Sequence, residues 1–148
     1  MFTWVLTGHG AESTPSLFIP QQLGHAALFS VLALATGSAL AMPMGAVLMN
    51  YMGHYVGALA ATSARPGVTI VLAWVPWAVI RVASFVAMGV VLSAPVLSRL
   101  LRFPFDWAAG RRVLVWAGAG LLADIVLKAA LAPWWQRTLL HVVGWVSR

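Results

Sequence analysis

The sequence predicts an all-α integral membrane protein: a small polytopic bundle of three or four transmembrane helices with a C-terminal interfacial amphipathic helix. Hydrophobic residues make up 61% of the chain and charged residues 8%, whereas soluble domains usually carry about 25% charged residues. The mean hydropathy is +0.90. A chain of 148 residues holds three or four spans of ~20 residues with little left for a soluble part. We therefore expect a single transmembrane domain over residues 1–148 that functions in or at the membrane.

The N-terminal residues 1–22 are expected to form a retained extramembrane arm. This segment contains no Lys or Arg, and its apolar pieces are interrupted by Gly8, Gly10, Pro15 and Pro20. It therefore lacks the basic and continuous apolar regions of a cleavable signal peptide.

Residues 23–62 contain no charged residue. A single helix over residues 24–62 would be roughly 58 Å long, about twice the ~30 Å hydrocarbon core. Gly37, Pro43 and Gly45 favour a break between them. We expect a helical hairpin with spans 20–41 and 44–62. The alternative is one long kinked helix to about Met49, followed by an interfacial segment.

The second half of the chain predicts two further spans, at residues 68–92 and 112–131, joined by the basic loop 95–111. Arginines 99, 102 and 111 lie in this loop and Arg112 follows it, so the positive-inside rule places the loop in the cytoplasm of a bacterial-type inner membrane. Residues 134–148 are expected to form the interfacial helix. With four spans both termini are external, and with three the N-terminus is internal.

Two charged residues fall near the midpoints of the last two expected spans. Arg81 lies in span 68–92 and Asp124 in span 112–131, and a lone charge at that depth costs roughly 2.5–3.5 kcal/mol. Antiparallel packing would bring the two together as an interhelical clamp, with Lys128 as a second partner of Asp124 at i+4. One alternative is that a member of this cluster pairs with a charge on another subunit. Another is a proton or ion path that uses Asp124.

Small residues recur every four positions in the first apolar region, a pattern typical of closely packed membrane helices. The packing partner is either within the chain or on another protein. The positions are Gly37, Ala41, Gly45, Gly53 and Gly57.

His25 and His54 lie near ends of the hairpin spans that would reach the same membrane face. An imidazole there has the chemistry for an axial contact to haem or chlorophyll, although no cofactor held by this chain alone is expected. The chain has no cysteine and no metal centre is expected.

The pattern of polar residues indicates a protein that is not an enzyme. No nucleophile has a base beside it, and no carboxylate pair is available for acid–base chemistry. The net charge is +6, but the nine basic residues form no patch on a soluble face, and four of them crowd into one loop between apolar segments. No nucleic-acid partner is therefore expected. The favoured function is a non-catalytic polytopic subunit that stabilises a larger inner-membrane complex, including one that holds cofactors or pigments on other chains. Its partners would be the lipid bilayer and other membrane subunits, with a hetero-oligomer favoured.

Two other functions fit the sequence. One is a small oligomeric transporter or channel that uses Asp124 as a titratable group. The other is a holin-like pore former, which small size and basic charge would suit.

The run MNYMGHYVGALAATSARPGVTIVLAWVPWAVI at residues 49–80 resembles two groups of membrane proteins. It is similar to the Yip-type bacterial membrane proteins, in which a polar helix end and a short link precede a span with a proline in its middle. It also resembles the stage II sporulation protein M group, where a glycine-rich span is followed by a proline-bearing one. The polar motifs of both groups are absent here, so the resemblance assigns no functional residue.

Overall fold

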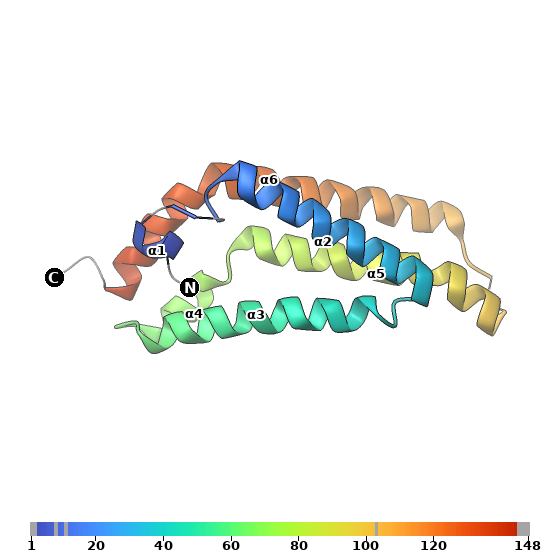
Figure 1. Cartoon of the computed structure of the whole chain (residues 1–148), viewed down its shortest axis with the longest axis horizontal. Coiled ribbons are helices and arrows are strands. Elements are labelled where there is room, and N and C mark those ends of the chain that lie inside the picture. The colour runs from blue at the N-terminus through green and yellow to red at the C-terminus, as the bar shows by residue number, and fades with distance from the viewer. Residues whose placement is uncertain (1–2, 8, 11, 103, 145–148) are drawn as a thin grey trace.

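The computed structural model describes residues 3–7, 9–10, 12–102 and 104–144, and these are helical apart from turns and short links. Four long helices run side by side and alternate in direction along the bundle (Figure 1). Two short helices complete the fold. In chain order the elements are α1 (Thr3–Thr7), α2 (Pro15–Thr36), α3 (Ala41–Ala61), α4 (Pro66–Ala73), α5 (Pro76–Leu101) and α6 (Trp107–Val143).

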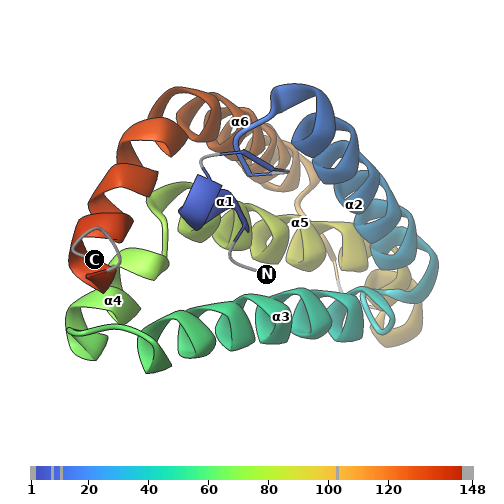
Figure 2. The same cartoon turned by 60° about the vertical axis from the view of Figure 1, so that its left-hand side comes forward.

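The bundle has two distinct ends. One end, here called the basic end, carries the turn 37–40 between α2 and α3 and the link between α5 and α6 (Figure 1). The opposite end, here called the terminal end, carries α1, α4 and the last turns of α6. Figure 2, in which the terminal end comes forward, shows α1 among the ends of the longer helices.

The segment 23–62 contains the hairpin, not the single kinked helix. The chain reverses at Gly37, where the backbone is left-handed with a φ of 58°, and Ser38 follows with a φ of 69°. The Ser38 hydroxyl donates a 2.7 Å hydrogen bond to the carbonyl of Gly89 on α5, which fixes the turn against the bundle. Pro43 lies in the first turn of α3, where its missing amide hydrogen removes no helical hydrogen bond.

The N-terminal arm is shorter than expected and folds onto the bundle. Helix α2 begins at Pro15, because proline is favoured at the first helical position, so residues 15–22 belong to the helix. Within the arm, Val5 is fully buried and Trp4 nearly so. Gln136 of α6 donates a 2.8 Å hydrogen bond to the carbonyl of Val5.

The expected span 68–92 is divided between two helices. Helix α4 ends at Ala73, and α5 begins at Pro76. Between them Val75, the residue before the proline, has the extended backbone (φ −62°, ψ 139°) that this position prefers. Helix α5 then continues through Pro95 to Leu101. The expected loop 95–111 is consequently reduced to the link 102–106.

The expected span 112–131 and residues 134–143 of the expected interfacial helix 134–148 belong to one helix in the structure. Helix α6 has 37 residues and passes through Pro133. Its last part turns toward α4 at the terminal end (Figure 2). Its last turns bury Leu139 and Val143 in an apolar cluster with Trp4 and Val5. Residues 134–143 therefore pack against the arm, and residues 145–148 lie outside the described part of the chain.

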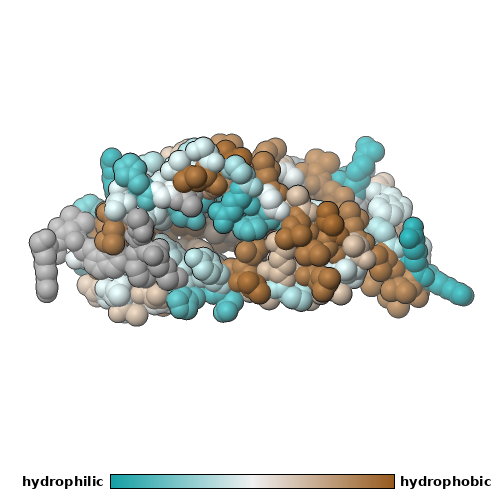
Figure 3. Space-filling view, viewed as in Figure 1, coloured by the Kyte–Doolittle hydropathy of each residue, from teal (hydrophilic) through white to brown (hydrophobic). Residues whose placement is uncertain are grey.

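The surface and interior are arranged as expected for a protein in lipid. Three helices, α2, α5 and α6, are long and apolar enough to cross a membrane. Large apolar side chains project outward from them, whereas Asp124 and Lys128 are almost fully buried. Figure 3 shows apolar side chains gathered over the half of the visible face nearer the basic end, with hydrophilic ones projecting at that end itself.

Candidate functional site: ion pairs inside the bundle and the outer face of α3

Helices α5 and α6 approach each other closely at the level of the buried charges. Gly120 lies one turn before Asp124, and a Cβ atom at Gly120 would fall on the hydroxyl of Ser84. Ser84 itself donates a 2.9 Å hydrogen bond to the carbonyl of Ile80 in its own helix. The absence of a side chain at Gly120 therefore permits the contact that brings the two helices together.

Arg81 and Asp124 form a two-pronged ion pair across this contact. The Nε and one terminal nitrogen of Arg81 each donate to a different carboxylate oxygen of Asp124, both at 2.9 Å. The side chain of Asp124 is 2% exposed and that of Arg81 is 28% exposed. This fork-to-fork geometry is the strongest arrangement available to an arginine and a carboxylate.

Lys128 pairs with a residue that sequence reasoning did not select. Its ammonium lies 2.7 Å from a carboxylate oxygen of Glu12, in the link between α1 and α2. It also lies 4.5 Å from the ring centroid of Phe18 on α2, within the range of a cation–π contact. The expected i, i+4 pair with Asp124 is not formed at ion-pair distance in the described part of the chain, because the folded arm supplies a closer carboxylate.

The three acidic residues of the sequence all have defined roles in the structure. Asp124 and Glu12 form the two ion pairs just described. Asp106 caps α6 by accepting hydrogen bonds from the backbone nitrogens of Ala108 and Ala109 at 2.9 and 3.2 Å. Because the chain has three acidic residues in all, Glu12 could have been considered as a partner of Lys128 from the sequence.

The geometry around Asp124 is that of a clamp. Both of its oxygens are bound by Arg81, and its side chain has almost no contact with the surroundings of the protein. The two pairs connect α5 to α6 and α6 to the N-terminal arm. They therefore join the last two long helices and the arm inside the bundle.

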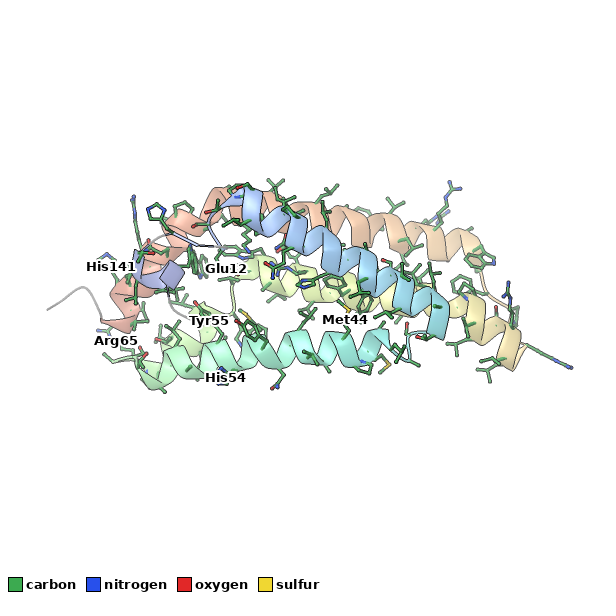
Figure 4. All side chains as sticks on the ribbon, in the orientation of Figure 1. Glu12, Met44, His54, Tyr55, Arg65 and His141 are labelled. Atoms are coloured by element: carbon green, nitrogen blue, oxygen red, sulfur yellow. The ribbon has the colours of Figure 1, made fainter. Side chains whose placement is uncertain are left out.

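The two histidines are not arranged as a ligand pair. Because α2 begins at Pro15, His25 lies in the middle of that helix and not near its end. His54 is exposed and points away from the other helices (Figure 4). Among the described residues, no group of three or more His, Asp or Glu side chains is placed to hold a metal ion.

The small residues divide into two groups. Gly37, Ala41 and Gly45 pack within the chain: a Cβ at Gly37 would lie 3.1 Å from Val96, Ala41 is fully buried, and a Cβ at Gly45 would lie 3.8 Å from Phe29. A Cβ atom at Gly53 or Gly57 would meet no atom within 4 Å. Side chains added at Gly53 and Gly57 would therefore enter open space.

Gly53 and Gly57 belong to a larger surface, here called the outer face of α3. Its members are exposed and lie within about one third of the helix circumference at 100° per residue. Tyr55 lies on the opposite side of the helix and points inward (Figure 4). The outer face consists of Pro43, Ala46, Val47, Asn50, Gly53, His54, Gly57 and Ala61.

The chain matches no protein-family model, and no curated protein or solved structure is detectably similar to it. The two resemblances noted for residues 49–80 therefore carry no argument about function.

Proposed function

We propose that this chain is a non-catalytic subunit of a larger assembly in a bacterial-type inner membrane, and that the outer face of α3 joins it to a helix of another subunit. The two ion pairs hold α6 to α5 and to the N-terminal arm, and Val56 and Leu59 of α3 pack in the same apolar cluster as Trp4 and Val5 of that arm. The proposal depends on one observation above the others, which is the composition and exposure of the outer face.

The outer face is unsuited to contact with lipid alone. Asn50 and His54 carry hydrogen-bonding groups that lipid tails cannot satisfy, and such groups in a hydrocarbon environment cost free energy. Gly53 and Gly57 offer a backbone surface that a second helix can approach closely. A partner helix would satisfy the polar groups and fill the space above the glycines.

This argument requires that α3 crosses the membrane beside α2 and α5. Helix α3 begins at the basic end and finishes at the terminal end, as a spanning helix would (Figure 1). Its 21 residues give a length of roughly 31 Å, which matches the hydrocarbon core. We therefore propose four spans. The hydropathy of α3 is lower than that of α2, α5 and α6 because this helix carries polar residues such as Asn50 and His54.

The orientation follows from the distribution of arginines. Four exposed arginines surround the basic end, whereas Arg65 and Arg137 lie toward the terminal end. The positive-inside rule places the basic end, and with it the segment 95–111, in the cytoplasm. Four spans then put the N-terminal arm and the end of α6 outside.

The buried charges also favour a structural subunit over a transporter that uses Asp124. A transport path needs a group that water or an ion can reach, and Asp124 is 2% exposed with Arg81 on both oxygens. If Asp124 nevertheless conducts, reconstituted vesicles will show a flux that Asp124→Asn abolishes.

The proposal is tested by filling the outer face with leucine. Gly53→Leu with Gly57→Leu should release the chain from its assembly, seen as a shift to a smaller species on a native gel of gently solubilised membranes. Gly24→Leu with Gly118→Leu is the matched control, because a Cβ at either of those positions also meets no atom within 4 Å. Equal migration of both variants and the original protein would overturn the proposal.

A further inference from the structure

A shallow depression lies on the first half of α6 near the basic end. It is wide open to the surroundings and is lined by four residues of this one helix, Arg111, Arg112, Val115 and Trp116. No role in the clamp or in the outer face of α3 involves these residues.

Along α6 the two arginines come first and the two apolar residues follow. A phospholipid has the same order, with its charged headgroup first and its acyl chains below. Arg111 and Arg112 lie in the second turn of the helix, and Val115 and Trp116 lie one turn deeper toward the middle of the bundle. In the proposed orientation, the two guanidinium groups would lie nearer the cytoplasmic membrane surface than the apolar side chains of Val115 and Trp116. Trp116 is 77% exposed, so its ring is available to an acyl chain.

The guanidinium groups have no carboxylate partner in the described structure. The two ion pairs found there involve Arg81 and Lys128, which lie elsewhere. The carboxylate of Asp106, at the start of the same helix, accepts hydrogen bonds from two backbone amides. Arg111 and Arg112 are both exposed, and arginine forks bind phosphate oxygens well.

We propose that this depression binds the headgroup phosphate of an anionic phospholipid in the cytoplasmic leaflet. Arg111 and Arg112 hold the phosphate, and Val115 with Trp116 contacts the adjoining acyl chain. Basic residues at the cytoplasmic end of a membrane helix attract the anionic headgroups of that leaflet. The inference uses the proposed orientation of the chain but not the partner of α3, so a failure of either proposal leaves the other testable.

The test compares two variants that remove the same charge from the same end of the bundle. Lipid retention is measured by native mass spectrometry of the purified protein titrated with phosphatidylglycerol, and with phosphatidylcholine as the zwitterionic reference. Arg111→Gln with Arg112→Gln should weaken phosphatidylglycerol binding about thirtyfold, at about fivefold per arginine near the surface. Arg99→Gln with Arg102→Gln should change it by no more than about threefold. Equal weakening by the two pairs would show a response to net charge only and would overturn the proposal.

Trp116→Ala separates a lipid from a free phosphate and keeps the test valid if the arginine variant does not fold. This substitution should reduce phosphatidylglycerol retention and leave the weak binding of soluble glycerol phosphate unchanged. Tight binding of glycerol phosphate, or phosphatidylglycerol retention that does not depend on Trp116, would contradict a lipid site.

Discussion

Arg81 and Asp124 form a pair whose members are unequally buried, and this inequality predicts unequal effects of substitution. Arg81→Ala leaves the Asp124 carboxylate, 2% exposed, without its partner, while Asp124→Ala leaves an Arg81 side chain that is 28% exposed. We expect Arg81→Ala to lower the free energy of unfolding by about 3–5 kcal/mol and Asp124→Ala by less. The measurement is a titration of the unfolding of each variant with sodium dodecyl sulfate in mixed micelles.

Replacing both members of the pair supplies the control for this prediction. Asp124→Ala combined with Arg81→Leu removes both charges, and such a double replacement is often nearly neutral. The double variant should therefore recover most of the stability lost in Arg81→Ala. A double variant as unstable as the sum of the two single ones would show that the residues act independently.

The second ion pair predicts an asymmetry of the same kind. The side chain of Lys128 is 3% exposed and that of Glu12 is 52% exposed. Removing Glu12 therefore leaves a buried charge without a partner, whereas removing Lys128 leaves a charge that water can reach. Glu12→Gln should destabilise the protein by about 1.5–3 kcal/mol, because it leaves a buried ammonium with a weaker acceptor. Lys128→Met should cost less than about 1 kcal/mol, because Glu12 can be hydrated. The reverse ranking in the same titration would contradict the buried geometry of Lys128.

At the scale of helices, two neighbouring glycines of α6 have opposite surroundings. A Cβ at Gly118 meets nothing within 4 Å, whereas one at Gly120 would fall on Ser84 and lie 3.6 Å from Ile80. Gly120→Leu should separate α5 from α6 and lower stability by about 1–3 kcal/mol. Gly118→Leu should leave stability unchanged or raise it by about 0.5 kcal/mol, since leucine is the better helix former. Similar thermal unfolding of the two variants would show that α5 and α6 are not in close contact at Gly120.

The sequence predicted helices better than it predicted where they end. The charge-free run with Gly37, Pro43 and Gly45 favoured a hairpin, because no single helix of that length fits a bilayer, and left a long kinked helix as the alternative. The expected spans 20–41 and 44–62 place the turn later than the structure does, at residues 37–40 between α2 and α3. The expected spans 68–92 and 112–131 end just before Pro95 and Pro133, yet both prolines lie inside helices in the structure. A proline costs one hydrogen bond and some bending, which packing of the surrounding turns can offset.

Of the two ion pairs, the one between Arg81 and Asp124 was predicted from the sequence and the one between Glu12 and Lys128 was not. Arg81 and Asp124 fall near the midpoints of the expected antiparallel spans 68–92 and 112–131, and this similar depth predicted their proximity. The structure forms the pair, although Arg81 lies in the second turn of α5 and not at its middle. Glu12 meets Lys128 only because the N-terminal arm folds back over the bundle, and this depends on the burial of Trp4 and Val5 against α6. No periodicity in the sequence encodes such a tertiary contact.

At the scale of the whole molecule, the direction of the bundle in the membrane is open to a labelling test. The chain contains no cysteine, so a single introduced thiol reports one position. Ala109→Cys, near the basic end, should be protected from a membrane-impermeant thiol reagent in intact cells. Ala64→Cys, at the terminal end, should be labelled. Both positions are exposed in the structure, so the reverse pattern would invert the orientation.

The central claim is that the outer face of α3 contacts another protein, and site-specific photo-crosslinking in intact cells tests it most directly. A photoreactive residue is placed at Ala46 or Ala61, at the margins of the face, so that Gly53 and Gly57 remain intact. The control positions are Leu28 on α2 and Val126 on α6, which are 51% and 64% exposed. We predict a discrete protein adduct from Ala46 and Ala61 and none from Leu28 and Val126. The absence of an adduct at both α3 positions, or the same adduct at all four, would contradict the claim.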